Sequence, residues 1–334
     1  MTVDPDPDGP ARWPSAVAAL GEVYARKWQR RLKYGLRCLL TTRGRRLVLD
    51  HVRQSSQARA LLASAPRAFY PAMHKHLDRR FDTLSRARSL IESMRNMERV
   101  ADLELARALF RGDLVTLGTL PDTTRITLGL NRLTFHEGLW ALDLTRADGL
   151  RLFTISFGWT DQETLMLACV QGPPRDMDGL DCVRQLTDAA HGLRPAHLLM
   201  FMLRACARRW NVRQMIGVDE AHQVKGRWNH RAKERHFDYA AFWADAAGVP
   251  GQDGNWRLPV DVPTRPIEEV ASKRRAMYRR RYAMLDSLLA SVADALASPG
   301  RALAPETPDH GLAADSLFPS RSDAEGSHIR HCRA

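Results

Sequence analysis

The middle of the chain alternates short apolar runs with turn-forming residues, whereas both flanks carry apolar residues at helical spacing. Short runs bounded by Gly, Asp and Pro are typical of antiparallel strands joined by tight turns. The pair Asp148-Gly149 separates two such runs and is a strong hairpin signal. The expected strands cover residues 114–120, 125–130, 139–144, 150–157 and 164–170.

Helices are predicted on both sides of this strand series. In residues 15–111, apolar positions such as Leu90, Ile91 and Met94 recur at intervals of three and four. Further helices are expected at 180–190, 195–210, 239–247 and 268–296, with one strand at 212–218 and a Gly- and Pro-rich loop at 248–266. The helix pair before the strand at 212–218 predicts a crossover connection. Tyr239, Phe242 and Trp243 share one helix face, which predicts core or interface packing.

The pattern as a whole predicts an α+β fold, in which an N-terminal helical region precedes a mixed, largely antiparallel sheet with flanking helices. Strands that end in a Gly-containing loop before a helix resemble the acyl-CoA-binding half of acetyltransferase-like folds. Both ends of the chain are rich in Pro, Asp or Ser and are expected to be disordered. The expected boundaries are a disordered segment 1–14, a helical region 15–111, an α+β domain 112–297 and a disordered tail 298–334.

The chain has 334 residues and a formal net charge of +12, from 50 Lys and Arg against 38 Asp and Glu. This excess favours an anionic partner: a phosphate-bearing ligand, an acidic membrane surface or nucleic acid. The five cysteines are an odd number without metal-site spacing, a pattern typical of a reduced cytoplasmic protein. No secretory signal and no transmembrane segment is predicted. The oligomeric state stays open.

Positive charge is concentrated in one segment that covers the start of the last expected helix. Residues 264–281 contain seven basic residues and two acidic ones. In a helix, tyrosine rings beside arginine guanidinium groups suit a phosphate-rich partner. The alternative is a solvated face whose arginines pair with acids elsewhere. The expected anion-binding residues are Lys273, Arg274, Arg275, Tyr278, Arg279, Arg280, Arg281 and Tyr282.

Two loops carry candidate ligand-binding residues. In the loop 171–179, Gln171, Gly172 and Arg175 could place donors around an anion at a helix N-terminus. Two prolines in this loop remove N–H donors, and several aspartates place negative charge where the anion would sit. The alternative is a strand-to-helix turn in which an Asp caps the helix. His191 and Arg194 could bind an anionic group between two helices, or His191 could belong to a helix end closed by a left-handed glycine. The helical region 15–111 is assigned no chemistry.

Three residues are the general acid–base candidates. Asp219 and His222 follow the strand at 212–218, where open sheets place ligands, and Glu137 precedes a strand. Surface loop positions and ion pairs with arginine are the alternatives. The spacing of His222, His230 and His236 is too loose for a metal site, so no metal is expected. The cofactor is unknown, with acyl-CoA as the one candidate.

Several short motifs together resemble the VirK/YbjX family of bacterial proteins. They keep their order over residues 112–289, whereas the helical region resembles the family only in its general pattern of residues. At Arg88-Ser89 the chain departs from the His-Tyr pair often found there, so nothing is transferred to that position. The motifs are FHEG at 135–138, VQG at 170–172, HGLRP at 191–195, IGV at 216–218, DYAAFW at 238–243 and KRRAMYRRRY at 273–282.

The resemblance implies a bacterial protein associated with virulence or stress, without an agreed reaction or catalytic residues. Three functions follow as hypotheses. The first is a cytoplasmic stress- or virulence-associated protein that binds an anionic partner through the basic C-terminal helix. The second is an acyl-CoA-dependent acyltransferase-like enzyme. The third is a nucleic-acid-binding regulator, which charge permits but no recognised motif supports.

Overall fold

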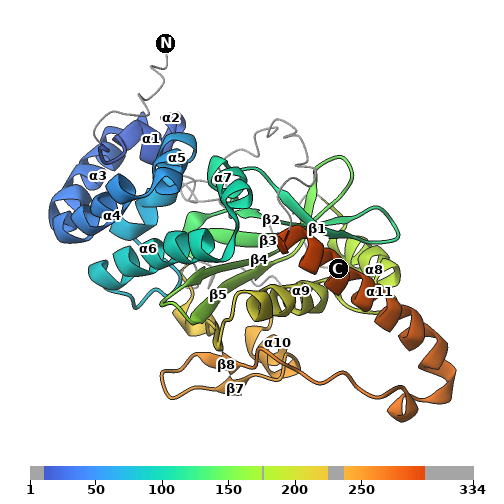
Figure 1. Cartoon of the computed structure of the whole chain (residues 1–334). Coiled ribbons are helices and arrows are strands. Elements are labelled where there is room, and N and C mark those ends of the chain that lie inside the picture. The colour runs from blue at the N-terminus through green and yellow to red at the C-terminus, as the bar shows by residue number, and fades with distance from the viewer. Residues whose placement is uncertain (1–10, 175–176, 225–236, 298–334) are drawn as a thin grey trace, which may run out of the picture.

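The computed structural model describes residues 11–174, 177–224 and 237–297, and it confirms the α+β fold. N-terminal helices precede one eight-stranded sheet, and further helices flank that sheet (Figure 1). Arg175, residues 1–10 of the expected N-terminal segment 1–14 and the expected tail 298–334 lie outside the described residues.

The N-terminal region is helical because its side chains cap successive helices. Ser55, Asp82 and Asp102 each accept a hydrogen bond from a backbone N–H in the first turn of the helix that follows. Gly112 ends the last of these helices in a left-handed conformation, with φ 97°. The helices are α1 (Ala16–Leu20), α2 (Glu22–Ala25), α3 (Trp28–Leu40), α4 (Thr42–Gln54), α5 (Ser56–Ser64), the 3₁₀ helix η1 (Pro66–Met73), α6 (Thr83–Val100) and α7 (Leu103–Arg111).

The sheet has the strand order β1-β2-β3-β4-β5-β6-β8-β7. All neighbouring strands are antiparallel except β5 and β6, which are parallel. The strands are β1 (Val115–Thr119), β2 (Arg125–Leu130), β3 (Trp140–Thr145), β4 (Arg151–Trp159), β5 (Thr164–Gln171), β6 (Gln214–Gly217), β7 (Val249–Pro250) and β8 (Trp256–Leu258).

The segments after β5 follow the expected order with one correction. Helices α8 (Gly179–Ala189) and α9 (Pro195–Arg209) form the crossover from β5 to β6, and α10 (Tyr239–Asp245) and α11 (Ser272–Ala297) come later. The loop expected at 248–266 is wrong in part, because it contains the strands β7 and β8. Those strands are only two and three residues long, too short to show an alternating pattern.

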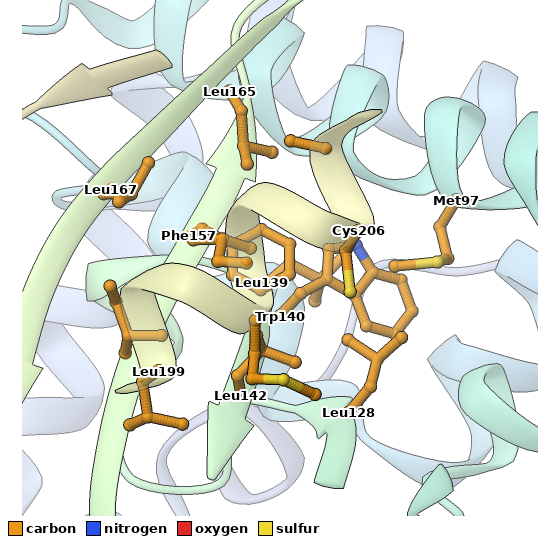
Figure 2. Close-up of a cluster of buried hydrophobic side chains, with 14 of the residues drawn as sticks. Met97, Leu128, Leu139, Trp140, Leu142, Phe157, Leu165, Leu167, Leu199 and Cys206 are labelled. Atoms are coloured by element: carbon orange, nitrogen blue, oxygen red, sulfur yellow. The ribbon is translucent and has the colours of Figure 1, made fainter. Parts of the chain in front are cut away.

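One face of the sheet is apolar and is covered by α9. Leu142 and Phe157 from the strands belong to the same buried cluster as Leu199 and Cys206 from α9 (Figure 2). Alternate strand residues point to the same face, so this cluster collects every second side chain of each strand. The buried positions of Tyr239, Phe242 and Trp243 confirm the expected core packing of α10.

The buried side chains of helix α11 lie in its C-terminal half. Leu288 and Val292 are buried, and a Cβ on Gly118 of β1 would lie 2.5 Å from Leu288 Cδ2, so the glycine allows this close approach. The N-terminal half of α11 extends past α8 and away from the sheet (Figure 1). Its basic side chains are therefore carried on a part of the helix that buries little apolar surface.

Candidate functional site

The parallel strands β5 and β6 separate at their carboxyl ends. Their last paired residues are Leu167 and Gly217, but β5 continues to Gln171. Where β6 no longer pairs with β5, the Tyr239 hydroxyl of α10 donates to Val170 O at 3.0 Å and accepts from Val170 N at 3.2 Å. Burial raises the pKa of Tyr239 well above its ordinary value. The buried phenol therefore takes the place of a neighbouring strand.

Glu137 and Gln171, predicted separately as catalytic and ligand-binding residues, meet beside this point. Gln171 Nε2 donates to Glu137 Oε2 at 2.7 Å, and Glu137 is buried. Glu137 ends the 3₁₀ helix η2 (Phe135–Glu137). The next residue, Gly138, has φ 129°, and a Cβ there would lie 2.4 Å from Phe157 O, so only glycine fits. The carboxylate is thus placed by a turn that the sequence shows as FHEG.

A polar row crosses the second face of the sheet next to Gln171. The strand register places Thr127, Asp143, Thr154 and Gln171 opposite one another on β2, β3, β4 and β5. The Thr154 hydroxyl donates to Asp143 Oδ1, and burial raises the pKa of the Asp143 carboxyl. A buried carboxyl with a raised pKa is a candidate proton donor. The sequence interpretation missed Asp143 because it treated 139–144 as one apolar run.

Asp219 and His222 belong to a second hydrogen-bonded group, after β6. Asn255 Oδ1 accepts the Asp219 N–H at 3.1 Å and lies 3.0 Å from His222 Nδ1. Because an amide oxygen only accepts, His222 Nδ1 donates this hydrogen bond. Asn255 Nδ2 donates at 3.0 Å to the buried Asp78, which also pairs with Arg80. This chain of contacts fixes the ring of His222.

One segment of the N-terminal region connects the two groups. Leu77 N donates to His136 O at 2.8 Å, and Arg79 N donates to His222 O at 2.9 Å. His76, between the helical region and the sheet, is fully buried, with Nδ1 3.1 Å from Phe135 O. Residues 74–80 thus link the turn at Glu137 to the turn at His222, although the sequence interpretation assigned that region no chemistry.

The loop before α8 ends in a turn capped by Asp178, which is the alternative to an anion-binding loop. Asp178 accepts hydrogen bonds from Leu180 N and Asp181 N, both at 3.1 Å. Two of the N–H groups at the start of α8 are therefore occupied by a carboxylate. Gly172 precedes this turn, and a Cβ there would lie 3.6 Å from the Phe153 ring.

His191 and Arg194 lie in the connection between α8 and α9. His191 has φ 51° and Gly192 has φ 80°, so both residues contribute to the left-handed turn that ends α8. The carbonyl of His191 accepts Arg281 Nε at 3.0 Å and Nη2 at 2.9 Å. Arg194 is exposed. No contact found among the described residues joins either side chain to Glu137, Gln171 or His222.

The basic segment of α11 divides into structural and exposed side chains. Arg275 donates to Val270 O at 2.9 Å, Arg281 binds His191 O, and the Tyr282 hydroxyl donates to Arg265 O at 2.6 Å. The guanidinium carbon of Arg281 also lies 4.3 Å from the centroid of the Tyr278 ring. Within the described part of the chain, four exposed residues of the segment make no ion pair: Lys273, Arg274, Arg279 and Arg280.

Two general features bear on the kind of site. Across residues 11–174, 177–224 and 237–297, no group of three or more His, Cys, Asp or Glu side chains is arranged to hold a metal ion. In the same ranges, no helix has both the length and the apolar content needed to cross a membrane.

The comparisons with known proteins identify the family. The family described as "Protein of unknown function (DUF535)" matches residues 24–294, so the chain belongs to it, the VirK/YbjX family. The chain is 30% identical to an uncharacterised protein of Haemophilus influenzae over 211 residues, 63% of this chain and 71% of that protein.

Two further relatives carry names. The chain is 33% identical to the uncharacterised protein YbjX of Escherichia coli over 157 residues, 46% of this chain and 47% of YbjX. It is 28% identical to the membrane protein LapB of Mannheimia haemolytica over 218 residues, 64% of this chain and 94% of LapB. No solved structure matches the chain. The predicted family is confirmed.

Buried histidines predict that the fold is sensitive to acid. Burial lowers the pKa of His74 to about 3, of His76 to about 3 and of His51 to about 4, from an ordinary 6.5. Between about pH 6.5 and pH 4 the unfolded chain therefore binds more protons than the folded one, so the free energy of unfolding falls as the pH falls. Urea unfolding at several pH values measures this loss.

The variant His74→Phe provides the matched comparison. The ring keeps its contacts with Tyr70 and His136, whose centroids lie 5.9 and 5.5 Å away, but no longer titrates. We expect its free energy of unfolding to fall less than that of the wild type over the same pH range. Equal losses in the two proteins would show that His74 does not contribute.

Proposed function

We propose that this VirK/YbjX-family protein binds a phosphate-bearing anionic partner through the N-terminal half of α11. The observation that carries the proposal is the exposure of Lys273, Arg274, Arg279 and Arg280 without an acidic partner among the described residues. Cations of this kind release counterions when they meet phosphates, which gives affinity without any need for a pocket. Arg275, Arg281 and Tyr282 support the proposal differently, because they fix the helix that carries the exposed cations.

The source of the phosphate and the cellular location of the protein are also proposals. The name of LapB describes a membrane protein, which favours a lipid headgroup as one source of the phosphate, and nucleic acid is the other. None of the four described cysteines forms a disulfide within the described residues, which is compatible with a cytoplasmic setting. The stress or virulence association comes from the family resemblance alone.

An acyl-CoA-dependent acyltransferase is the second candidate. It is favoured by the seven strands β2 to β8, in which a parallel pair, β5 and β6, follows an antiparallel series and separates at its carboxyl ends. Asp143, Glu137 and His222 would supply its acid–base groups. Two contacts count against it: Tyr239 occupies the backbone groups at Val170, and Asp178 occupies N–H groups at the start of α8. The geometry therefore gives this candidate less support.

The first proposal is tested with Arg279→Ala/Arg280→Ala and a labelled DNA duplex as the phosphate polymer. Each cation that contacts a phosphate contributes about 0.9 to the slope of log affinity against log salt, so the variant should lower the slope by about 1.8. The matched control is Arg59→Ala/Arg88→Ala, which removes the same charge from exposed positions on α5 and α6.

Parallel measurements with phosphatidylglycerol vesicles distinguish the two sources of phosphate. Binding to the duplex that depends on Arg279 and Arg280 indicates nucleic acid, and the same dependence seen only with vesicles indicates a lipid headgroup. Equal slopes for the variant and its control, with both probes, would show that α11 is not the binding surface.

The acyltransferase candidate is tested by thermal unfolding with acetyl-CoA. A ligand present at about 100 times its dissociation constant stabilises the folded state by about 2.7 kcal/mol, which raises Tm by several degrees. If the sheet holds acyl-CoA, the shift should persist in Arg279→Ala/Arg280→Ala and should not appear with ATP at the same concentration. The candidate is wrong if millimolar acetyl-CoA leaves Tm unchanged.

A further inference from the structure

Helix α3 presents its apolar side chains to solvent. Trp28, Leu32, Leu36, Leu39 and Leu40 recur at intervals of four, four, three and one residues, so they form one stripe along the helix. Their exposed fractions are 69%, 64%, 54%, 74% and 74%. Leu47, in the second turn of α4, is also exposed. A helix that packs on a globular core normally turns such a stripe inward.

The opposite side of α3 makes the contacts with the protein. Tyr34 is buried and its ring stacks on Tyr70, with centroids 6.1 Å apart. Arg37 donates to the Tyr70 hydroxyl, and Arg45 of α4 donates to Cys38 O at 2.7 Å. The helix is therefore fixed through its polar side. These contacts set the orientation of α3 and direct its apolar stripe toward solvent.

Basic residues surround the stripe. Residues 22–47 contain nine Arg and Lys and a single acidic residue, Glu22. Three of these cations, Arg30, Arg37 and Arg45, contact the protein itself. The other six are exposed and make no ion pair with the described part of the chain: Arg26, Lys27, Arg31, Lys33, Arg43 and Arg46.

We propose that this face of α3 and the start of α4 binds the surface of an anionic lipid bilayer. An apolar stripe containing Trp and Leu, with Arg and Lys beside it, is the composition of helices that lie in the membrane interface. The leucines and Trp28 enter the boundary between headgroups and acyl chains, and the cations meet the phosphates of acidic lipids. The 13 residues of α3 give a contact about 20 Å long in the plane of the membrane.

A second copy of the chain fits this face less well. A symmetric pair of such faces would bring six exposed cations of each copy against the same six of the other, without acids between them. Like charges at that range repel, whereas an anionic bilayer neutralises them. The charge around the stripe therefore selects the lipid surface over self-association.

This surface is separate from the one in the proposed function. Helix α3 lies at one end of the molecule and the projecting half of α11 lies at the other (Figure 1). The two surfaces can therefore be disrupted independently, and the failure of one proposal does not decide the other.

Sedimentation with lipid vesicles tests the inference. The full chain is mixed with vesicles of phosphatidylcholine alone or with about 30% phosphatidylglycerol, the acidic lipid that basic surfaces recognise. We expect binding to the anionic vesicles and at least tenfold weaker binding to the neutral ones. Leu32→Glu/Leu36→Glu should weaken binding by about tenfold or more. Arg31→Ala/Lys33→Ala should weaken it about 25-fold, fivefold for each cation.

The control variants use exposed positions outside this face. Leu103→Glu/Leu180→Glu changes two leucines that are 55% and 73% exposed, at the first turns of α7 and α8, where an acidic residue is favourable. This variant and Arg59→Ala/Arg88→Ala, which removes two exposed cations outside both proposed surfaces, should bind the vesicles as the wild type does. Circular dichroism establishes that each variant is folded.

Several results would overturn the inference. They are no sedimentation with either vesicle, equal binding to neutral and anionic vesicles, and full binding by Leu32→Glu/Leu36→Glu. A dimer that this variant disperses would show that the face is covered by a second copy. Vesicle binding lost only in Arg279→Ala/Arg280→Ala would reject this inference and support the proposed function.

Discussion

Burial of the apolar face of the sheet is the interaction on which the rest of the structure depends. Leu142 and Phe157 of the sheet pack in one cluster with Leu199 and Cys206 of α9, and Leu288 of α11 covers Gly118 of β1. Each large aliphatic side chain buried in this way contributes about 1.5–3 kcal/mol. This packing holds the crossover helix and the C-terminal half of α11, and it leaves the N-terminal half of α11 without a core to cover.

The second face of the sheet combines polar contacts with a small apolar cluster that includes Leu77 and Met166. The separation of β5 from β6 leaves backbone groups that Tyr239 satisfies, and Asp143 and Gln171 lie in a polar row beside it. Residues 74–80 connect this area to the group formed by Asn255 and His222. Buried polar groups need partners, so such an arrangement specifies one geometry wherever it is completely paired. This is the part of the fold in which acid–base chemistry could be placed.

The sequence predicted the strands and helices well where a local pattern determines them. The strand 125–130 and the helix that begins at Pro195 have the expected start, because turn residues and a proline at the first position act locally.

The sequence also predicted Glu137 and Gln171 as site residues, but not that they meet, since the contact depends on strand register. Asn255 and Asp78 were missed because their hydrogen-bonded group with His222 joins residues far apart in the chain. His76 was missed because its partner, Phe135, is also distant in the sequence. The exposed face of α3 was missed for a related reason: its periodicity is that of a buried helix, and only the packing of Tyr34 shows which side faces the protein.

Helix α11 divides into a C-terminal half with buried side chains and an N-terminal half that projects from the protein, and amide hydrogen exchange measures this division directly. Peptides from residues 285–296, which include the buried Leu288 and Val292, should exchange at least about tenfold more slowly than peptides from residues 273–281, because buried contacts determine local protection. Equal protection along the whole helix would contradict the account, since it would mean that the cationic half is packed against the protein rather than open to a partner.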